Sequence, residues 1–477
     1  MKDFNKVMLI TYADSMGKDL HELDTAVSEY FSGAIGGMHI LPFYPSSGDR
    51  GFSPITYEEV EPAFGTWSDI ESLSKRYFMM ADFMINHISR RSEYFHDFEE
   101  KKDESEYRDF FIRFRDFWPN GEPTEEDLAK MIHRHPGVPE VEITFRDGTK
   151  EKLWCTFSPE QIDLNIHSAK AREYIAKSVD GIIRHGISAI RLDAMAFVDK
   201  KPGTDCFFLE PDIWKSLKFA DETISSRGAV SLVEIHTNYE RQLKVAETGV
   251  YVYDFVLPLL VLHTLYTGSS AALKKWLQVC PHNQFTVLDT HDGIGISDAE
   301  GVLSPEEIRA AKDMIFEKSG VDHKYSFVED YQVNCTYYAA LGSNDQAYLL
   351  ARAIQFFTPG IPQVYYVGML AGENDVAKGR DGRDVNRHNY SLAEVADCAK
   401  SSIVERLTAL MRFRNICTAF DGEISVDNNS ADSMLSISWK NGGAEATLTA
   451  DLKNCHFHIG CSEADEQTAA LLRKINQ

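Results

Sequence analysis

Eight short runs of aliphatic, β-branched and aromatic residues recur along the chain, and a stretch with helical periodicity follows each run. The runs lie at 6–13, 37–43, 78–87, 189–195, 230–236, 250–256, 285–292 and 361–368. Strands that alternate with helices form a parallel sheet, so the pattern indicates the α/β class and predicts a closed (β/α)8 TIM barrel. An open, doubly wound sheet is the competing topology. Against it, no Gly-x-Gly-x-x-Gly follows the first run, and the chain has no phosphate loop.

Two segments interrupt this alternation. The segment between the third and fourth runs is rich in aromatic and charged residues and too long for a simple connection, which predicts an inserted subdomain after strand 3. Near the C-terminus, the period-two patterns "DSMLSISWK", "AEATLTADL" and "CHFHIG" predict an antiparallel β domain. We therefore expect four parts, with the barrel at 1–87 and 161–415, the inserted subdomain at 88–160 and the β domain at 416–477.

The chain is strongly acidic. Its 73 acidic and 49 basic residues give a formal charge of −24, which argues against nucleic acid and anionic membranes as partners. The N-terminal "MKDFNKVMLI" has no basic segment followed by a long apolar stretch, and no window approaches a membrane span. Eight cysteines occur without Cys-x-x-Cys spacing, so neither a zinc site nor a disulfide framework is expected. These features predict a cytoplasmic protein.

Polar residues gather at the C-terminal ends of four of the predicted strands. In chain order they are Asp82, Asn86, His87, Arg191, Asp193, Glu234, His236, Asp289, His291 and Asp292. The C-terminal ends of the strands carry the chemistry in (β/α)8 barrels. A single acidic residue at a strand end is most often a solvated cap, but carboxylates from four strands predict one shared site.

These clustered carboxylates leave two chemistries open. The three histidines of the set could join the aspartates in holding a transition metal. Arg191 favours the second chemistry, acid–base and nucleophilic work on a sugar, because it shares a strand face with Asp193 and would keep that carboxyl ionised as a nucleophile. Glu234 has no adjacent cation and is expected to hold a proton that it can donate. Two carboxyl groups in unlike environments are typical of glycoside chemistry.

Two sets of motifs resemble a known family. The chain is similar over its whole length to the α-amylase superfamily, glycoside hydrolase family 13, through "DFMINH" (82–87), "QIDLN" (161–165), "RLDAMAF" (191–197), "EIH" (234–236) and "DTHDG" (289–293). Within this family it most resembles the sucrose phosphorylases, through "LITYADS" (9–15), "HILPFYPSSGDRGFSPITY" (39–57), "DYQVNCTYYAAL" (330–341), "PGIPQVYYVG" (359–368) and "GRDVNRHNY" (382–390).

The resemblance implies a role for each matching residue. Asp193 would be the nucleophile, Glu234 the general acid/base, and Asp292 the residue that holds the sugar 2- and 3-hydroxyls and stabilises the oxocarbenium-like transition state. The other sugar-binding residues that it implies are Asp49, Phe52, His87, Phe157, Arg191, His236, His291 and Arg387. The two phenylalanines would supply flat apolar faces, and the charged residues would bind the remote hydroxyls.

Phosphate must approach an acidic protein, so local cations are needed. The candidates are Arg134 and His135, next to His133, and the pair His323-Lys324 in the loop before "DYQVN". In related phosphorylases the loops at these two positions line the acceptor side.

The acceptor side also contains two departures from the family pattern. Tyr331 and Gln332 match the sucrose-specific branch, but Phe197 replaces an expected tyrosine, and Glu329 stands where an aspartate usually grips fructose. The lost hydroxyl removes a hydrogen bond of about 1 kcal/mol. The resemblance therefore leaves the acceptor open among fructose, fructose 6-phosphate, glycerol and glycerate.

The implied reaction is retaining phosphorolysis, in which sucrose and inorganic phosphate give α-D-glucose 1-phosphate and fructose through a β-glucosyl-enzyme. The resemblance implies no cofactor and no metal ion, and it is compatible with a homodimer. An α-glucoside hydrolase is an alternative. A catalytically inactive amylase-like protein that serves as a partner or transporter subunit is another, against which the complete catalytic set argues.

Overall fold

The computed structural model of the chain describes residues 4–134, 137–326, 331–376, 382–462 and 464–477. Its main sheet is a closed barrel with the strand order β1-β14-β11-β10-β9-β8-β3-β2. The barrel strands are β1 (Met8–Thr11), β2 (Gly37–Ile40), β3 (Phe78–Met84), β8 (Ala189–Asp193), β9 (Val230–Val233), β10 (Tyr251–Asp254), β11 (Gln284–Thr286) and β14 (Ile361–Tyr365). Seven fall within a predicted run, and β11 begins one residue before its run. The predicted (β/α)8 barrel is confirmed, and the doubly wound alternative is wrong.

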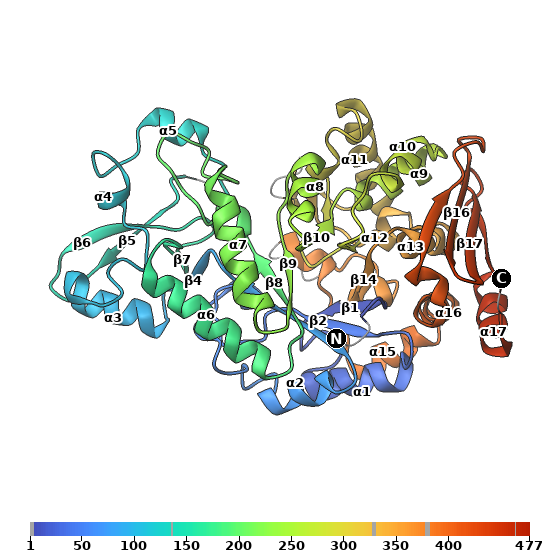
Figure 1. Cartoon of the computed structure of the whole chain (residues 1–477), viewed down its shortest axis with the longest axis horizontal. Coiled ribbons are helices and arrows are strands. Elements are labelled where there is room, and N and C mark those ends of the chain that lie inside the picture. Colours follow the sequence, from blue (N-terminus) through green and yellow to red (C-terminus); the bar gives the residue numbers. More distant parts are fainter. Residues whose placement is uncertain (1–3, 135–136, 327–330, 377–381, 463) are drawn as a thin grey trace. The chain divides into compact units, whose positions relative to one another are not determined.

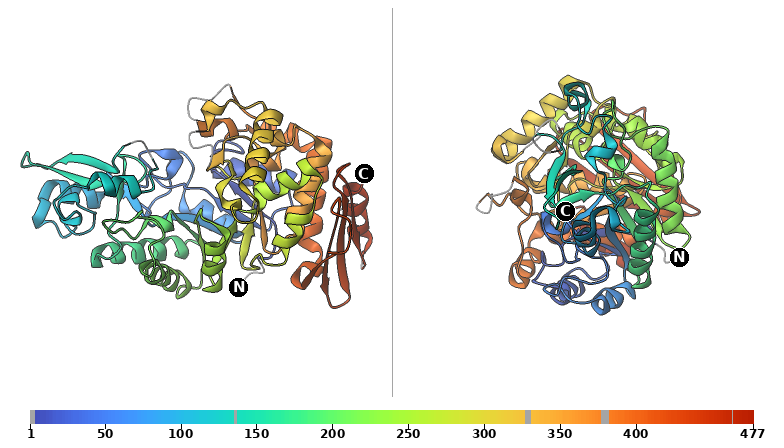
Figure 2. Two further views of the ribbon diagram at one scale, coloured as in Figure 1. Left: turned by 90° about the horizontal axis from the view of Figure 1, so that it is seen from above. Right: turned by 90° about the vertical axis from the view of Figure 1, so that its left-hand side faces the viewer.

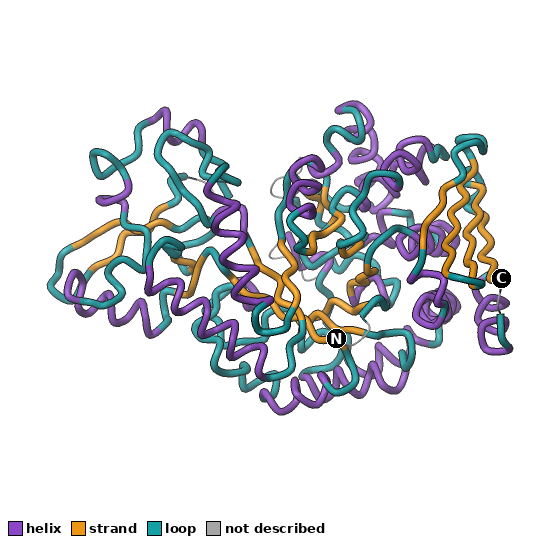
Figure 3. Tube along the Cα trace, viewed as in Figure 1, coloured by secondary structure: helices purple, strands orange, loops and turns teal. Residues whose placement is uncertain are grey.

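Helices occupy the intervals between the barrel strands and also follow the last of these strands, as the purple segments of Figure 3 show. They are α1 (Leu20–Tyr30), α2 (Trp67–Ser74), α6 (Ala169–Arg184), α7 (Asp212–Ser225), α8 (Tyr239–Glu247), α9 (Leu257–Thr267), α10 (Ala271–Leu277), α11 (Pro305–Ser319), α12 (Tyr337–Ala340), α13 (Asp345–Phe357), α14 (Tyr366–Met369), α15 (Leu392–Ala399) and α16 (Ser402–Ile416). They include helices in the chain segments where helical periodicity was expected after the apolar runs.

The chain divides into two compact units, which are described separately below. Unit 1 comprises Met1–His39, Arg76–Phe78 and His236–Gln477, and unit 2 comprises Ile40–Lys75 and Met79–Ile235. The four-part division expected from the sequence stays a prediction.

Unit 2 contains the parallel strands β3, β8 and β9 and the segment inserted after β3. All seven residues of β3 are buried, as expected for a parallel strand that is covered on both faces. Helices α6 and α7 pack side by side (Figure 1). The inserted segment contains β4 (His87–Ser89), α3 (Glu93–Lys101), α4 (Phe114–Phe117), α5 (Glu125–Lys130), β5 (Glu140–Thr144), β6 (Lys150–Trp154) and β7 (Gln161–Asp163). Its β5–β6 hairpin is seen in teal in Figure 2.

Unit 1 contains the parallel pairs β1/β14, β10/β11 and β11/β14, and two short strands, β12 (Ile294–Gly295) and β13 (Gln332–Val333), that pair with each other. It ends in an antiparallel sheet of four strands, β15 (Glu423–Val426), β16 (Met434–Asn441), β17 (Ala444–Asp451) and β18 (His456–Cys461). Helix α17 (Glu466–Ile475) contacts α16 and β18 within this unit (Figure 2). The C-terminal β structure is confirmed, but β15 and α17 were not predicted.

Candidate active site

One arginine holds a group of carboxylates in unit 2. Arg191 of β8 lies opposite Asp82 of β3 in the parallel ladder. Its Nη1 donates to Asp82 Oδ1 and, at 2.9 Å, to Oδ1 of Asp193, two residues further along β8. The Arg191 side chain is 4% exposed, and that of Asp82 is fully buried. The strand spacing correctly predicts the contact between Arg191 and Asp193. The sequence did not indicate that Arg191 also bonds to Asp82.

Glu234 follows β9 and contacts the same arginine. Its Oε1 lies 3.8 Å from Arg191 Nη2, and its Oε2 accepts a hydrogen bond from the backbone N–H of Ala194 at 2.9 Å. The expectation that Glu234 has no adjacent cation is wrong, because β8 and β9 are neighbouring strands and bring residues that are distant in sequence together. Asp193 and Glu234 still differ, since Asp193 accepts a direct hydrogen bond from the guanidinium and Glu234 forms a longer ion pair with it.

The backbone next to these carboxyls is strained. Ala194 has φ 56° and ψ 31°, in the left-handed region that a residue with a Cβ rarely adopts. This conformation costs about 1 kcal/mol, and the Ala194 N–H donates to the Glu234 carboxyl. Asp49 and Arg50 also have positive φ values, 47° and 49°. Such residues cluster at functional sites, because only a demanding local geometry justifies the strain.

Aromatic and imidazole rings surround the sugar-binding candidates of unit 2. Phe52 is buried, and the Arg191 guanidinium carbon lies 5.8 Å from its ring centroid. His87 Nε2 donates to the carbonyl oxygen of Phe52 at 2.9 Å, and the His87 ring packs edge-on against Phe157 with centroids 5.3 Å apart. Burial lowers the pKa of His87, so its imidazole is neutral at pH 7. The structure thus brings Phe52, His87 and Phe157 together, and Phe52 connects this group to Arg191.

Two acceptor-side candidates also meet in unit 2. The Arg134 guanidinium carbon lies 5.1 Å from the centroid of the Phe197 ring. Phe197 packs in turn against Phe157 and Phe207, with centroid distances of 5.4 and 4.9 Å. The ring that replaces the expected tyrosine is therefore held by aromatic contacts and carries a cation on one face. His135 lies outside the described residues.

A second cluster, in unit 1, surrounds Asp292. Its Oδ2 lies 3.3 Å from His291 Nε2, and its Oδ1 lies 3.3 Å from Arg383 Nη1 and 3.7 Å from Arg387 Nη2. The turn that carries Asp292 requires glycine at the next position. Gly293 has φ 111°, and a Cβ there would lie 2.5 Å from the carbonyl oxygen of Val333.

Arg387 is buried and incompletely bonded. Its Nε donates to the carbonyl oxygen of His291 at 2.8 Å. Its Nη2 has no hydrogen-bond acceptor among the described residues, although Asp292 lies within ion-pair distance. A buried donor without an acceptor is costly in a protein that binds nothing there, so this atom is a candidate for contact with a ligand hydroxyl.

His236 has a defined orientation in unit 1. Its ring stacks on Phe255 with centroids 3.9 Å apart and meets Tyr331 edge-on at 5.1 Å. Its Nδ1 lies 3.2 Å from Oδ2 of Asp298, which is fully buried. Of the predicted acceptor residues, Tyr331 therefore contacts His236 and Gln332 begins β13, whereas Glu329 lies outside the described residues.

The other cation candidates are held by local contacts. His133 is within hydrogen-bond distance of the carbonyl oxygens of Leu128 and Gly137, and Lys324 Nζ lies 3.1 Å from Asp322. Over the parts of the chain that the structure describes, no group of three or more His, Cys, Asp and Glu side chains is arranged to hold a metal ion.

The comparisons with known proteins show the family of the chain. Residues 33–239 match the family model described as "Alpha amylase, catalytic domain". The chain is 45% identical to the sucrose phosphorylase of Streptococcus mutans, over 96% of this chain and 98% of that protein. It is 43% identical to the glucosylglycerol phosphorylase of Marinobacter adhaerens, over 94% and 95% of the two chains. The crystal structure of sucrose 6F-phosphate phosphorylase from Thermoanaerobacter thermosaccharolyticum superposes with a TM-score of 0.92, at 43% identity and 97% coverage of both chains.

The chain belongs to the α-amylase superfamily, within the group of phosphorylases that includes these relatives. The resemblance that the sequence motifs indicated is thereby confirmed. No helix in the described ranges combines the length and the apolar character that a bilayer crossing requires.

Proposed function

We propose that this protein is a retaining phosphorylase that converts sucrose and inorganic phosphate into α-D-glucose 1-phosphate and D-fructose. The observation that carries the proposal is the arginine shared by two carboxyls, with Arg191 bonded to Asp193 at 2.9 Å and 3.8 Å from Glu234. Retaining glycoside chemistry needs a charged nucleophile and a proton donor close together, and this arrangement supplies candidates for both.

In the first step, Asp193 attacks the anomeric carbon of the glucosyl group. The bond to fructose breaks, Glu234 transfers its proton to the fructose oxygen, and a β-glucosyl ester of Asp193 forms. The hydrogen bond from Arg191 supports this role, because it favours the ionised form of Asp193 before the attack. The hydrogen bond from the Ala194 N–H supports the role of Glu234, since it fixes one carboxyl oxygen and so orients the carboxyl group.

In the second step, phosphate attacks the same carbon and releases Asp193, which gives α-D-glucose 1-phosphate. Phosphate is already an anion near neutral pH, so it needs less help from a general base than water does. Arg134 is the proposed phosphate contact in unit 2, where it lies against the Phe197 ring.

Recognition of glucose is assigned from the family resemblance. We assign the sugar 2- and 3-hydroxyls to Asp292, and the incompletely bonded Nη2 of Arg387 to a further hydroxyl. By the same resemblance, Asp49, Phe52, His87, Phe157 and His291 are assigned to glucose binding.

Phe197 supports a second candidate, a phosphorylase of the same type with another acceptor. Its ring packs against Phe157 and Phe207 but carries no hydroxyl, so it cannot supply the hydrogen bond to the acceptor that the expected tyrosine would donate. The relatives described above include a sucrose 6F-phosphate phosphorylase and a glucosylglycerol phosphorylase.

A donor panel tests the proposal. Purified protein is incubated with sucrose, sucrose 6′-phosphate, glucosylglycerol or glucosylglycerate, with and without phosphate, while glucose 1-phosphate and free glucose are measured. The proposal expects phosphate-dependent glucose 1-phosphate, with sucrose the best donor. A preference for another donor supports the second candidate, and free glucose regardless of phosphate indicates a hydrolase and contradicts both.

The role of Glu234 has its own test. Glu234→Gln should abolish turnover of sucrose but spare phosphorolysis of α-glucosyl fluoride, because fluoride leaves without a proton. Glu222→Gln on α7 is the matched control, since the Glu222 side chain is 66% exposed and has no role in the proposed reaction. Equal losses with both donors would remove Glu234 from the role of general acid.

A further inference from the structure

Lys200 is a buried lysine that the proposed reaction does not use. It lies in unit 2, three residues after Phe197, and its side chain is only 1% exposed. Its Nζ lies 2.6 Å from Asp163 Oδ2 and donates to Asn86 Oδ1 at 3.1 Å and to the carbonyl oxygen of Phe197 at 2.6 Å. An ammonium group has three N–H donors, so a carboxylate, an amide and a backbone carbonyl satisfy all of them.

The three oxygens belong to three segments that border the candidate active site. Asn86 lies between β3 and β4 and precedes His87. Asp163 ends β7 of the inserted segment, where it lies opposite His87 in the β4/β7 ladder. Phe197 ends the short 3₁₀ turn η3 (Met195–Phe197), which follows Asp193 and Ala194. One ammonium therefore bonds to Asn86, which precedes His87 in sequence, to Asp163, which lies opposite His87, and to the turn that follows Asp193.

The partner carboxylate depends on this ammonium. Asp163 is fully buried. It accepts hydrogen bonds from the Thr156 N–H at 2.8 Å, the Thr156 hydroxyl at 2.5 Å and the Asn86 side chain at 3.0 Å. These neutral donors solvate the carboxylate but do not cancel its charge. Without Lys200, the Asp163 carboxylate would remain as a buried negative charge with no cation beside it, which is costly.

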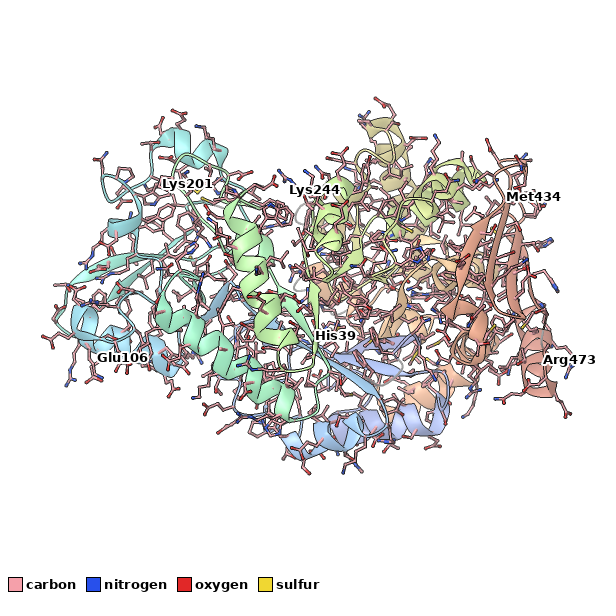
Figure 4. All side chains as sticks on the ribbon, viewed as in Figure 1. His39, Glu106, Lys201, Lys244, Met434 and Arg473 are labelled. Atoms are coloured by element: carbon pink, nitrogen blue, oxygen red, sulfur yellow. The ribbon has the colours of Figure 1, made fainter. Side chains whose placement is uncertain are left out.

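The next residue provides a natural contrast. Lys201, which Figure 4 labels, is exposed, whereas the side chain of Lys200 is 1% exposed. Two adjacent lysines thus differ only in burial and partners, which makes Lys201 a matched control for any substitution of Lys200.

A cavity of about 240 Å³ adjoins Lys200. Its lining includes Arg113, Asn165, His167 and Val198. Removal of the lysine side chain would extend this cavity toward the three oxygens, so a small cation could take the place of the ammonium.

We propose that Lys200 is a positioning residue, whose buried ammonium fixes His87 and the Phe197 turn relative to Asp193. It acts through these residues and does not contact the substrate. The proposal rests on the function proposed above, because its main test measures a fall in kcat for phosphorolysis when these groups are displaced.

The test is chemical rescue of Lys200→Ala. Displacing groups at a reacting centre by about 1 Å lowers turnover by about 100-fold, so we expect kcat of this variant to fall by about 100-fold while KM changes less. Ethylammonium should bind in place of the lost side chain and raise kcat at least about tenfold, with saturation. Lys201→Ala should match the wild type and show no response to ethylammonium.

Two further variants keep the test decisive. Lys200→Met fills the space without the charge, and Lys200→Met with Asp163→Asn removes both charges, so the double variant should regain part of the activity that the single variant loses. Wild-type kcat in Lys200→Ala or in Lys200→Met would overturn the proposal. A reduced kcat that neither ethylammonium nor the double variant restores would also overturn it.

Melting experiments test the proposal in the two cases in which kinetics cannot, an unfolded Lys200→Ala variant and a wild-type protein without phosphorolysis. If Lys200→Ala is unfolded, ethylammonium should restore a cooperative melting transition, and failure to do so overturns the proposal. If the wild type shows no phosphorolysis, the proposed function fails, while a rise in melting temperature of Lys200→Ala with ethylammonium, absent from Lys201→Ala, still reports on the ammonium site.

Discussion

The two clusters of candidate residues are built with opposite charge patterns. In unit 2, Arg191 contacts three carboxylates, those of Asp82, Asp193 and Glu234. In unit 1, Asp292 lies within ion-pair distance of two arginines and a histidine. The first pattern suits groups that must stabilise positive charge on a sugar and exchange a proton. The second suits a carboxylate that stays ionised and a set of donors that bind hydroxyls.

The largest effect is expected from breaking the cluster of unit 2. Arg191→Met should lower kcat by more than about 1,000-fold, because Asp193 loses the donor that orients it. It should also destabilise the protein by about 3–5 kcal/mol, since the fully buried Asp82 loses its partner. Both effects are measurable by kinetics and by urea unfolding.

Arg184→Met is the control for this variant. Arg184 pairs with Asp180 on α6, but its side chain is 74% exposed, so its loss should change stability by less than about 0.5 kcal/mol. A stable Arg191→Met with normal turnover would show that the arginine does not organise the carboxylates.

Breaking the cluster of unit 1 should affect activity much more than stability. Asp292→Asn is expected to lower kcat by about 100- to 1,000-fold, as for the loss of one group that stabilises charge in a transition state. The change in unfolding free energy should stay within about 1 kcal/mol, because the carboxylate is partly exposed. Asp313→Asn, at an exposed position of α11, should leave both quantities unchanged. A large loss of stability would assign Asp292 a structural role instead.

A smaller effect should distinguish charge from hydrogen bonding in the same cluster. Arg387→Lys keeps a cation near Asp292 but removes Nη2, which has no hydrogen-bond acceptor among the residues described. We expect kcat/KM to fall by about 10- to 100-fold, the value of a hydrogen bond from a charged group. Unchanged kcat/KM for every donor of the panel would remove Arg387 from sugar recognition.

The smallest effect concerns the pH dependence of stability, which should have opposite signs in the two units. Burial raises the pKa of Asp254, at the end of β10 in unit 1, to about 6, from 3.8. The unfolded state releases this proton first as the pH rises, so the contribution of Asp254 to stability should fall between about pH 4 and pH 6 and stay constant above.

Burial acts in the other direction on His87 in unit 2, because it lowers the pKa of the imidazole from 6.5. The unfolded state then binds the proton first as the pH falls, so stability should decrease below about pH 6.5. Hydrogen exchange of peptides from β10 and β4, corrected for the intrinsic rate, measures both slopes, which are at most about 1.4 kcal/mol per pH unit. His87→Gln should abolish the slope of β4, and parallel slopes in the two peptides would contradict the comparison.

The sequence predicts the barrel well and the contacts of its site only in part. The strands are short and buried on both faces, so each appears as an apolar run that is readable without knowledge of its partners. The contact between Arg191 and Asp193 is equally local. In contrast, the contact between Arg191 and Glu234 joins two strands, and no pattern within either strand indicates it.

Lys200 illustrates the same limit more sharply. The sequence "VDKK" presents two lysines with identical chemistry, yet one is enclosed by three oxygens and the other is exposed. Burial of a lysine depends on acceptors that fold against it from Asn86 and Asp163, both far away in the chain. The strands of the C-terminal sheet alternate as expected. Helix α17 lies beyond the last of these period-two patterns, which indicate strands and carry no information about a helix that follows them.

The left-handed residue at position 194 has one more consequence. Its amide nitrogen is bonded to the carbonyl carbon of Asp193 and donates a hydrogen bond to Glu234, so one peptide unit links the two carboxyl-bearing residues. A substitution that disfavours the left-handed conformation should therefore disturb the position of Glu234 relative to Asp193. In a randomised library at this position, glycine and asparagine should be recovered far more often than valine or isoleucine.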